Sequence, residues 1–143
     1  MDSKKIIETE KKCIMQTYSR SSIVIDHGKG CYVFGKDGKK YLDLFGGLAT
    51  CSIGHGSKKV AEAVCNQAKK LVNVTNLYYT EPQVILAKKL VKLSGLGKCF
   101  FCNSGAEANE AAIKLVRKHT GKTDIVSTKH AFHGRTLGAL SAT

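Results

Sequence analysis

The sequence contains no long apolar run, only one proline and few acidic residues. No run approaches the roughly eighteen apolar residues that a membrane-spanning helix needs, which excludes such a helix. One proline beside 14 glycines excludes a collagen-like or proline-rich chain. Of the 143 residues, 43% are apolar and 24% are charged, a composition typical of a globular domain rather than a disordered chain.

Basic side chains outnumber acidic ones by 23 to 11, which gives a net charge of +12. Such an excess can indicate a small nucleic-acid-binding domain, and that function stays open as an alternative. The lysines, however, come as pairs spread along the chain: Lys4-Lys5, Lys11-Lys12, Lys39-Lys40, Lys58-Lys59, Lys69-Lys70 and Lys88-Lys89. This spacing favours solvated helix faces, so we expect no nucleic-acid partner.

The first twelve residues alternate charges and have no apolar segment like that of a secretory signal, so we expect a cytoplasmic protein with reduced thiols. The six cysteines are then expected to be small buried side chains: Cys13, Cys31, Cys51, Cys65, Cys99 and Cys102. Cys99 and Cys102 form a C-x-x-C pair within an expected strand. Their sulfurs would point to opposite faces of that strand, so we predict neither a disulfide nor a metal site there.

The first half of the chain reads as a helix, a hairpin and a second helix. We expect a helix over about Lys4–Tyr18, a strand over Ser22–Asp26, and a hairpin in which Asp37-Gly38 joins Cys31–Phe34 to Tyr41–Phe45. The next helix should start at an N-cap Ser57. Its core face is expected to be Val60, Ala61, Val64, Cys65, Ala68, Leu71 and Val72.

The second half predicts a helix and then an alternating α/β pattern. Thr80 as N-cap and Gln83 as its capping-box partner begin a helix that Gly95 ends, with its core face at Leu86, Ala87, Leu90, Val91 and Leu93. Strand Lys98–Cys102, a helix to about His119 and strand Thr123–Thr128 then predict a right-handed parallel crossover, and hence an α/β fold. One crossover cannot cover both faces of a parallel sheet, so we expect the N-terminal part of a longer protein.

Two loops carry the chemistry. Ser104-Gly105-Ala106-Glu107 is a capping box that opens a helix after a strand, where free N–H groups and the helix dipole make an anion site suited to phosphate. The alternative is a plain helix cap; no G-x-G-x-x-G or P-loop motif favours a nucleotide. Phe132-His133-Gly134-Arg135 follows the next strand, and so should lie at the same sheet edge.

Phe132 in this second loop offers a face for a flat heterocycle, and Arg135 offers a fork for a carboxylate. Alternatively, Phe132 is a core residue, His133 a satisfied loop residue and Arg135 a surface charge. Taken together, the two loops would hold a phosphate, a flat ring and a carboxylate in one crevice. Pyridoxal phosphate with an amino acid has those three parts.

The decapeptide 103–112 together with 131–136 resembles the class III (ornithine-type) aminotransferases of fold type I. Further stretches are similar to the members of that family that act on N2-acetylornithine: 15–20, 28–30, 37–43, 46–49, 54–55 and 138–143. The resemblance covers nearly the whole chain from about Glu10. It implies that residues 1–75 are the N-terminal segment (helix, hairpin, helix) of the small domain and linker. Residues 76–143 would begin the large α/β domain that binds pyridoxal phosphate.

Residue by residue, the resemblance implies that Ser104, Gly105 and Ala106 hold the cofactor phosphate, Phe132 stacks on the pyridine ring and Arg135 binds the substrate carboxylate. Tyr18 and Arg20 would border the mouth of the active site. The lysine that forms the Schiff base with the cofactor, an aspartate facing the pyridine nitrogen and a threonine from the partner subunit are expected downstream. These 143 residues alone should then be inactive, and a non-catalytic interaction module is a further alternative for them.

The activity implied is transfer of the δ-amino group of N2-acetylornithine to 2-oxoglutarate, which yields glutamate, in arginine biosynthesis. The enzyme is expected to be a cytoplasmic homodimer with no metal and no membrane partner. Related activities on ornithine, succinylornithine, acetyl-lysine or 4-aminobutyrate stay open, because the F-H-G-R loop is found across many of these enzymes.

Overall fold

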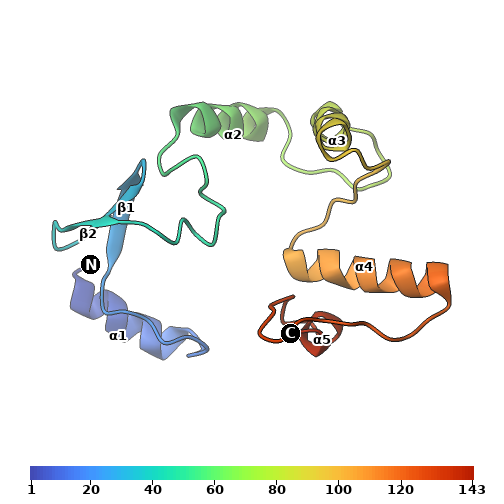
Figure 1. Ribbon diagram of the computed structural model, residues 1–143. Helices are drawn as coiled ribbons and strands as arrows, with labels where there is room; N and C mark the ends of the chain where they lie inside the picture. Colours follow the sequence, from blue (N-terminus) through green and yellow to red (C-terminus); the bar gives the residue numbers. More distant parts are fainter. The chain divides into compact units, whose positions relative to one another are not determined.

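The computed structural model describes residues 1–143, whose contacts divide into two compact units, Met1–Thr75 and Asn76–Thr143 (Figure 1). The first unit contains α1 (Ser3–Cys13), β1 (Ile25–Lys29), β2 (Tyr32–Gly35), β3 (Lys40–Leu42) and α2 (Lys58–Lys70). The second contains α3 (Glu81–Ser94), α4 (Gly105–Thr120) and α5 (Leu137–Ser141). None of these helices combines the length and the apolar character needed to cross a membrane.

The sheet of the first unit is antiparallel, with the strand order β1-β2-β3. Strands β2 and β3 form the predicted hairpin, with Tyr32 opposite Leu42. In its turn, Gly38 has φ +78°, a conformation that glycine adopts without steric cost. The Asp37 carboxylate accepts a hydrogen bond from the backbone N–H of Lys39 at 3.2 Å. The hairpin prediction at Asp37-Gly38 is therefore confirmed.

Several predicted boundaries in this unit are wrong. β1 ends at Lys29 instead of Asp26, and β3 ends at Leu42 instead of Phe45. β1 starts at Ile25, three residues after the predicted start, because its pairing with β2 runs from Ile25 opposite Gly35 to Lys29 opposite Tyr32. Helix α1 ends at Cys13 instead of Tyr18. Beyond it the backbone of Ile14 is extended, and its carbonyl accepts from the Gln16 side-chain amide at 2.8 Å, a local bond outside the helix.

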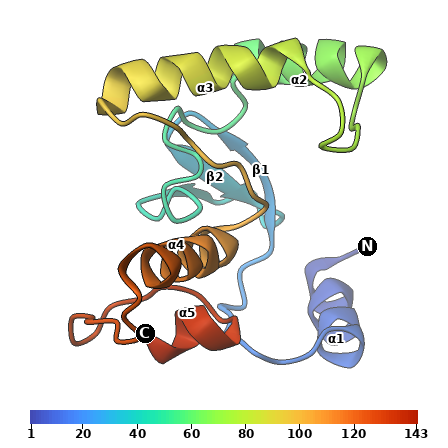
Figure 2. The ribbon, with the colours of Figure 1, turned by 90° about the vertical axis from the view of Figure 1, so that its right-hand side faces the viewer.

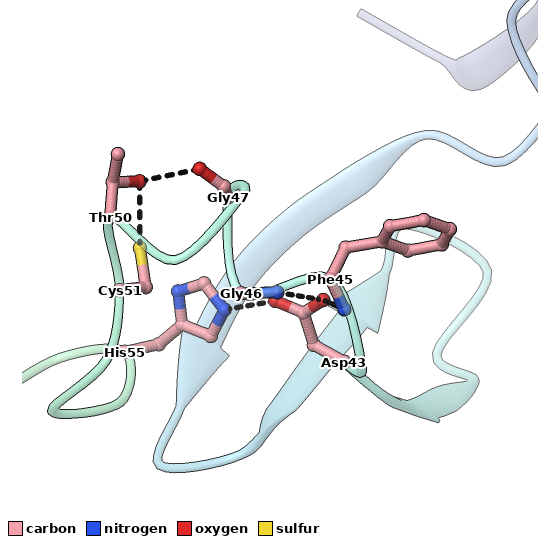
Figure 3. Close-up of polar contacts among 7 residues, drawn as sticks. All are labelled: Asp43, Phe45, Gly46, Gly47, Thr50, Cys51 and His55. Carbon is pink, nitrogen blue, oxygen red and sulfur yellow. Dashed lines mark hydrogen bonds and ion pairs between the residues drawn. The ribbon is translucent and has the colours of Figure 1, made fainter. Parts of the chain in front are cut away.

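A polar pair connects the two ends of the loop that follows β3 (Figure 3). Asp43 Oδ2 lies 2.7 Å from His55 Nε2, and these side chains are only 14% and 24% exposed. The other oxygen of Asp43 accepts from the backbone N–H groups of Phe45 and Gly46, both at 3.0 Å. His55 also exchanges two backbone hydrogen bonds with Gly30, at 2.9 and 2.8 Å. The His55 hydrogen bond is the main reason that the pKa of Asp43 lies below its ordinary value.

Within this loop the backbone makes one left-handed turn. Gly46, Gly47, Leu48 and Ala49 have φ values of +51°, +60°, +56° and +69°. For residues with a Cβ this region costs roughly 1–2 kcal/mol each. The turn therefore depends on the two glycines and on the bonds that Asp43 makes at its start.

Helices α2 and α3 begin at the predicted N-caps, Ser57 and Thr80, and α3 ends at Gly95 with φ +71°. Neither N-cap side chain makes a capping hydrogen bond, so the capping box predicted between Thr80 and Gln83 is wrong. The predicted burial of both apolar faces is also wrong. Neither helix packs against another helix or strand, so their apolar side chains, such as Val64 and Leu93, stay exposed.

The cysteines depart from expectation in the same way. All six are free thiols, but five are exposed and Cys51 is half-buried, so their predicted burial is wrong. The physical reason is again that no second element packs over the segments that carry them. Nowhere do three side chains of the metal-binding types come together as a possible cation site.

The two parallel strands predicted on either side of α4 do not form, so this part of the crossover prediction is wrong. Residues 98–102 and 123–128, on either side of α4, form no strand, because neither segment finds a neighbouring segment with which to share ladder hydrogen bonds. What does form is α4 packed against the short helix α5, which lie next to each other in both views (Figure 2). Ala139 of α5 is completely buried in this packing.

We expect Asp43→Ala to accelerate hydrogen exchange at the Phe45 and Gly46 amides, because both lose their acceptor. In the unsubstituted protein the pKa of Asp43 is lowered from 3.8, so its contribution is complete above pH 3.8 and is lost as the pH falls through the lower folded value. Lowering the pH below 3.8, through the pKa that Asp43 has in the folded protein, should therefore also reduce the exchange protection of the Phe45 and Gly46 amides. Glu62→Ala, an exposed change on α2, is the control. Protection of the Phe45 and Gly46 amides that survives in Asp43→Ala would show that the Asp43 carboxylate does not hold the start of this turn.

Candidate functional site

The N-terminus of α4 is capped by its own side chains. The hydroxyl of Ser104 accepts from the backbone N–H of Glu107 at 3.2 Å, as the capping box predicts. The Glu107 carboxylate accepts from the backbone N–H of Asn103 at 2.6 Å, one residue earlier than a standard box would place it, and also from the Asn103 side-chain amide. The cap is confirmed at Ser104 and is shifted by one residue at Glu107.

The next two amides have no protein acceptor. The backbone N–H groups of Gly105 and Ala106 donate to no group of the chain. A Cβ added at Gly105 would have no atom within 4 Å, so the space in front of it is open. Free N–H groups and the positive end of a 16-residue helix dipole favour an anion at this point.

The second predicted loop, residues 131–136, lies against this end of α4. Gly134, with φ +133°, comes so close that an added Cβ would lie 2.7 Å from the Cβ of Ala106 and 3.0 Å from that of Ala139. The Asn109 side-chain amide donates to the carbonyl of His133 at 2.6 Å. The two loops singled out in the sequence are therefore neighbours in space.

Between the two loops lies a pocket of about 550 Å³. Its lining residues are Gly105, Ala106, Asn109, Phe132, His133, Gly134, Arg135 and Thr136. Of the five predicted cofactor and substrate residues, four line the pocket, and Ser104 caps the helix beside it. Arg135 is the one lining residue that always carries a charge.

Phe132 and Arg135 form a pair in this lining. The guanidinium carbon of Arg135 lies 5.3 Å from the centre of the Phe132 ring, within cation–π range. Phe132 is 65% exposed, so it is not a core residue, contrary to the alternative drawn from the sequence. The Phe132 side chain is thus largely exposed, and the Arg135 guanidinium lies over its ring.

Glu110 also contributes to this site, although sequence reasoning missed it together with Asn109. One carboxylate oxygen of Glu110 accepts from the Thr136 hydroxyl at 2.6 Å and from the backbone N–H of Ala139 at 3.1 Å. The Thr136 bond is the main reason that the pKa of Glu110 lies below its ordinary value. The only available signal was helical spacing, since positions 109 and 110 follow Ala106 by three and four residues.

Tyr18 and Arg20 belong to the first unit, and their contacts there are local. The Arg20 guanidinium pairs with the Glu10 carboxylate at 2.9 Å and lies 5.7 Å from the centre of the Tyr18 ring. These contacts hold residues 18–20 against the end of α1.

Comparison with known proteins gives consistent matches. The family described as Aminotransferase class-III matches residues 14–143. An acetylornithine aminotransferase of Methanothermobacter thermautotrophicus is 54% identical over all 143 residues, which span 37% of that protein. One from Archaeoglobus fulgidus is 55% identical over 137 residues, which cover 96% of this chain and 36% of the relative.

A solved structure shows the same fold. Taurine:2-oxoglutarate aminotransferase from Bifidobacterium kashiwanohense, in complex with PLP and glutamate, superimposes with a TM-score of 0.89 at 30% identity. The match covers 97% of this chain and 32% of that one. The chain thus spans about a third of the length of the proteins it matches.

We expect Gly134→Ala to lower the free energy of unfolding by about 1–3 kcal/mol, because the new methyl group would overlap Ala106 in a strained backbone conformation. Gly105→Ala is the matched control, since its methyl group meets nothing and its φ is ordinary. Urea denaturation of both variants measures the difference. Equal stabilities would mean that the close approach of the loop to α4 imposes no constraint.

Proposed function

Because the chain belongs to the class-III aminotransferase family, we propose that it forms the phosphate- and carboxylate-binding part of an enzyme that moves the δ-amino group of N2-acetylornithine to 2-oxoglutarate. Two acetylornithine aminotransferases share 54% and 55% identity with it over almost its whole length. The observation that carries the proposal is the pocket where free helix amides, an aromatic face and a guanidinium converge.

The residues present fit pyridoxal phosphate. The unpartnered N–H groups of Gly105 and Ala106 can donate to phosphate oxygens, with open space in front of Gly105. Ser104 adds a third donor, because its oxygen accepts from Glu107 while its hydroxyl hydrogen is still free to donate. No carboxylate lines the pocket to repel the dianion. When bound, the cofactor supplies the reactive carbonyl and the electron sink that amino-group transfer requires.

Phe132 and Arg135 complete the proposed arrangement. The exposed ring of Phe132 can cover one face of the pyridine and exclude water from it. The Arg135 guanidinium can bind a substrate carboxylate through two parallel hydrogen bonds, and N2-acetylornithine, 2-oxoglutarate and glutamate all carry one. The role of these side chains is to bind and orient the substrates.

Further features of the proposal follow from the family resemblance. Residues 1–75 would belong to the small domain and linker, and 76–143 would begin the large cofactor-binding domain. The enzyme would act as a cytoplasmic homodimer. The lysine that binds the cofactor covalently lies downstream in the family, so the full-length protein is the one to assay.

The direct test is amino transfer by the full-length protein. We expect 2-oxoglutarate-dependent consumption of N2-acetylornithine, with a kcat/KM above those for ornithine, N2-succinylornithine, acetyl-lysine and 4-aminobutyrate. A higher kcat/KM for any of these four would replace the proposed substrate while leaving the family unchanged. Absence of cofactor binding would reject the proposal altogether.

Arg135→Lys should lower kcat/KM for N2-acetylornithine by the equivalent of about 1.5–3 kcal/mol, because lysine cannot form the bidentate pair. The visible absorbance of the bound cofactor should persist, since other residues hold it. Arg117→Lys, at the far end of α4 where Arg117 donates to the Thr123 carbonyl, is the matched control. Loss of the cofactor with normal substrate affinity would show that the role of Arg135 is assigned wrongly.

Phe132→Ala should act in the opposite order and weaken cofactor binding first. The matched control is Phe100→Ala, because Phe100 is similarly exposed, at 69%, and does not line the pocket. Cofactor affinity is measured by absorbance titration of the protein freed of cofactor. An unchanged affinity in Phe132→Ala would remove the stacking role.

A further inference from the structure

We propose that Asn109 and Glu110 are positioning residues that hold Phe132 and Arg135 over the N-terminus of α4, an inference that rests on the proposed function for its role in substrate binding. Both residues lie in the decapeptide 103–112, but the sequence analysis assigned no role to either. Both reach from α4 to a loop that follows more than twenty residues later in the chain.

The two side chains hold the loop on either side of Arg135. The Asn109 amide donates to the His133 carbonyl at 2.6 Å, just before Gly134. The Glu110 carboxylate accepts from the Thr136 hydroxyl at 2.6 Å, just after Arg135. Gly134 and Arg135 therefore lie between two short hydrogen bonds to consecutive residues of one helix.

A third contact fixes the distance between the loop and the helix. Gly134 packs on Ala106, which lies three and four residues before Asn109 and Glu110. Residues with this spacing share one face of a helix, about one turn apart. The face made by Ala106, Asn109 and Glu110 thus determines where the loop lies relative to the free amides at the same helix end.

Glu110 acts through the loop and not on a ligand. It does not line the pocket, and its carboxylate is used by the Thr136 hydroxyl and the Ala139 N–H. Its lowered pKa, due first to the Thr136 bond and then to the Ala139 N–H, agrees with an ionised carboxylate in this place. Hydrogen bonds to a charged acceptor are roughly twice as strong as those between neutral groups. The Glu110 carboxylate is therefore well suited to hold the loop against α4.

The first test is independent of any ligand and uses hydrogen exchange of the full-length protein without cofactor. We expect Asn109→Ala and Glu110→Ala to accelerate exchange across residues 133–139 at least about tenfold, the equivalent of one hydrogen bond of about 1.4 kcal/mol. The last turns of α4 should keep their protection. Asn66→Ala and Glu62→Ala, exposed changes on α2, are the matched controls. Unchanged exchange in residues 133–139 would overturn the inference whatever the protein binds.

The second test separates positioning from plain stability. In the full-length protein with pyridoxal phosphate, the probe is glutarate, a dicarboxylate that cannot accept an amino group. We expect the glutarate Kd of both alanine variants to rise about tenfold, as for one lost hydrogen bond, with cofactor affinity nearly unchanged. Glu110→Gln keeps an acceptor oxygen and should restore most of the glutarate affinity.

Three outcomes decide the matter. A lower Tm with unchanged glutarate Kd would mean that the two residues only stabilise the fold, and the inference would be wrong. If Glu110→Ala does not fold, Thr136→Val removes the same hydrogen bond from the loop side and must give the same rise in Kd. A parent protein that binds neither pyridoxal phosphate nor glutarate would reject the proposed function, while the exchange experiment would still decide whether Asn109 and Glu110 hold the loop.

Discussion

The close approach of Gly134 to Ala106 is the contact on which the rest of the site depends. A side chain at position 134 would overlap the Ala106 methyl group and push the loop away from the end of α4. The free amides of Gly105 and Ala106 would then no longer share a pocket with Phe132 and Arg135. Because Gly134 has no Cβ, the free amides at the start of α4 and the Arg135 side chain can line the same pocket.

Hydrogen bonds from polar side chains then hold the loop in this position against α4. Apolar burial is sparse in the protein: Ala139 is the one buried apolar side chain and no larger one is buried, so burial alone cannot specify where a loop lies. Asn109 and Glu110 do so in the second unit, and Asp43 with His55 do so in the first. In the second unit these hydrogen bonds connect a glycine-containing loop to a helix, and in the first unit the hydrogen bond connects the two ends of a glycine-containing loop.

The prediction that the two loops meet was right, although its reasoning was wrong. It assumed that residues 98–102 and 123–128 pair in a parallel sheet, so that the loops after them share one edge. Those segments pair with nothing, and the loops meet because Gly134 and Asn109 connect residues 131–136 to α4. A strand needs a partner for its backbone groups, and its own sequence cannot show whether the partner is present.

The sequence by itself determined the local features: the helix starts at Ser57, Thr80 and Ser104, the stop at Gly95 and the turn at Asp37-Gly38. Each depends on dihedral preferences and hydrogen bonds within a few residues, which neighbouring side chains specify. The family resemblance was also present in short motifs. Tertiary structure alone decided which apolar faces are covered, where the cysteines lie and that Asn109 and Glu110 belong to the site. These outcomes depend on groups distant in the chain, and for Asn109 the partner is a backbone carbonyl 24 residues later, which carries no signal in the sequence.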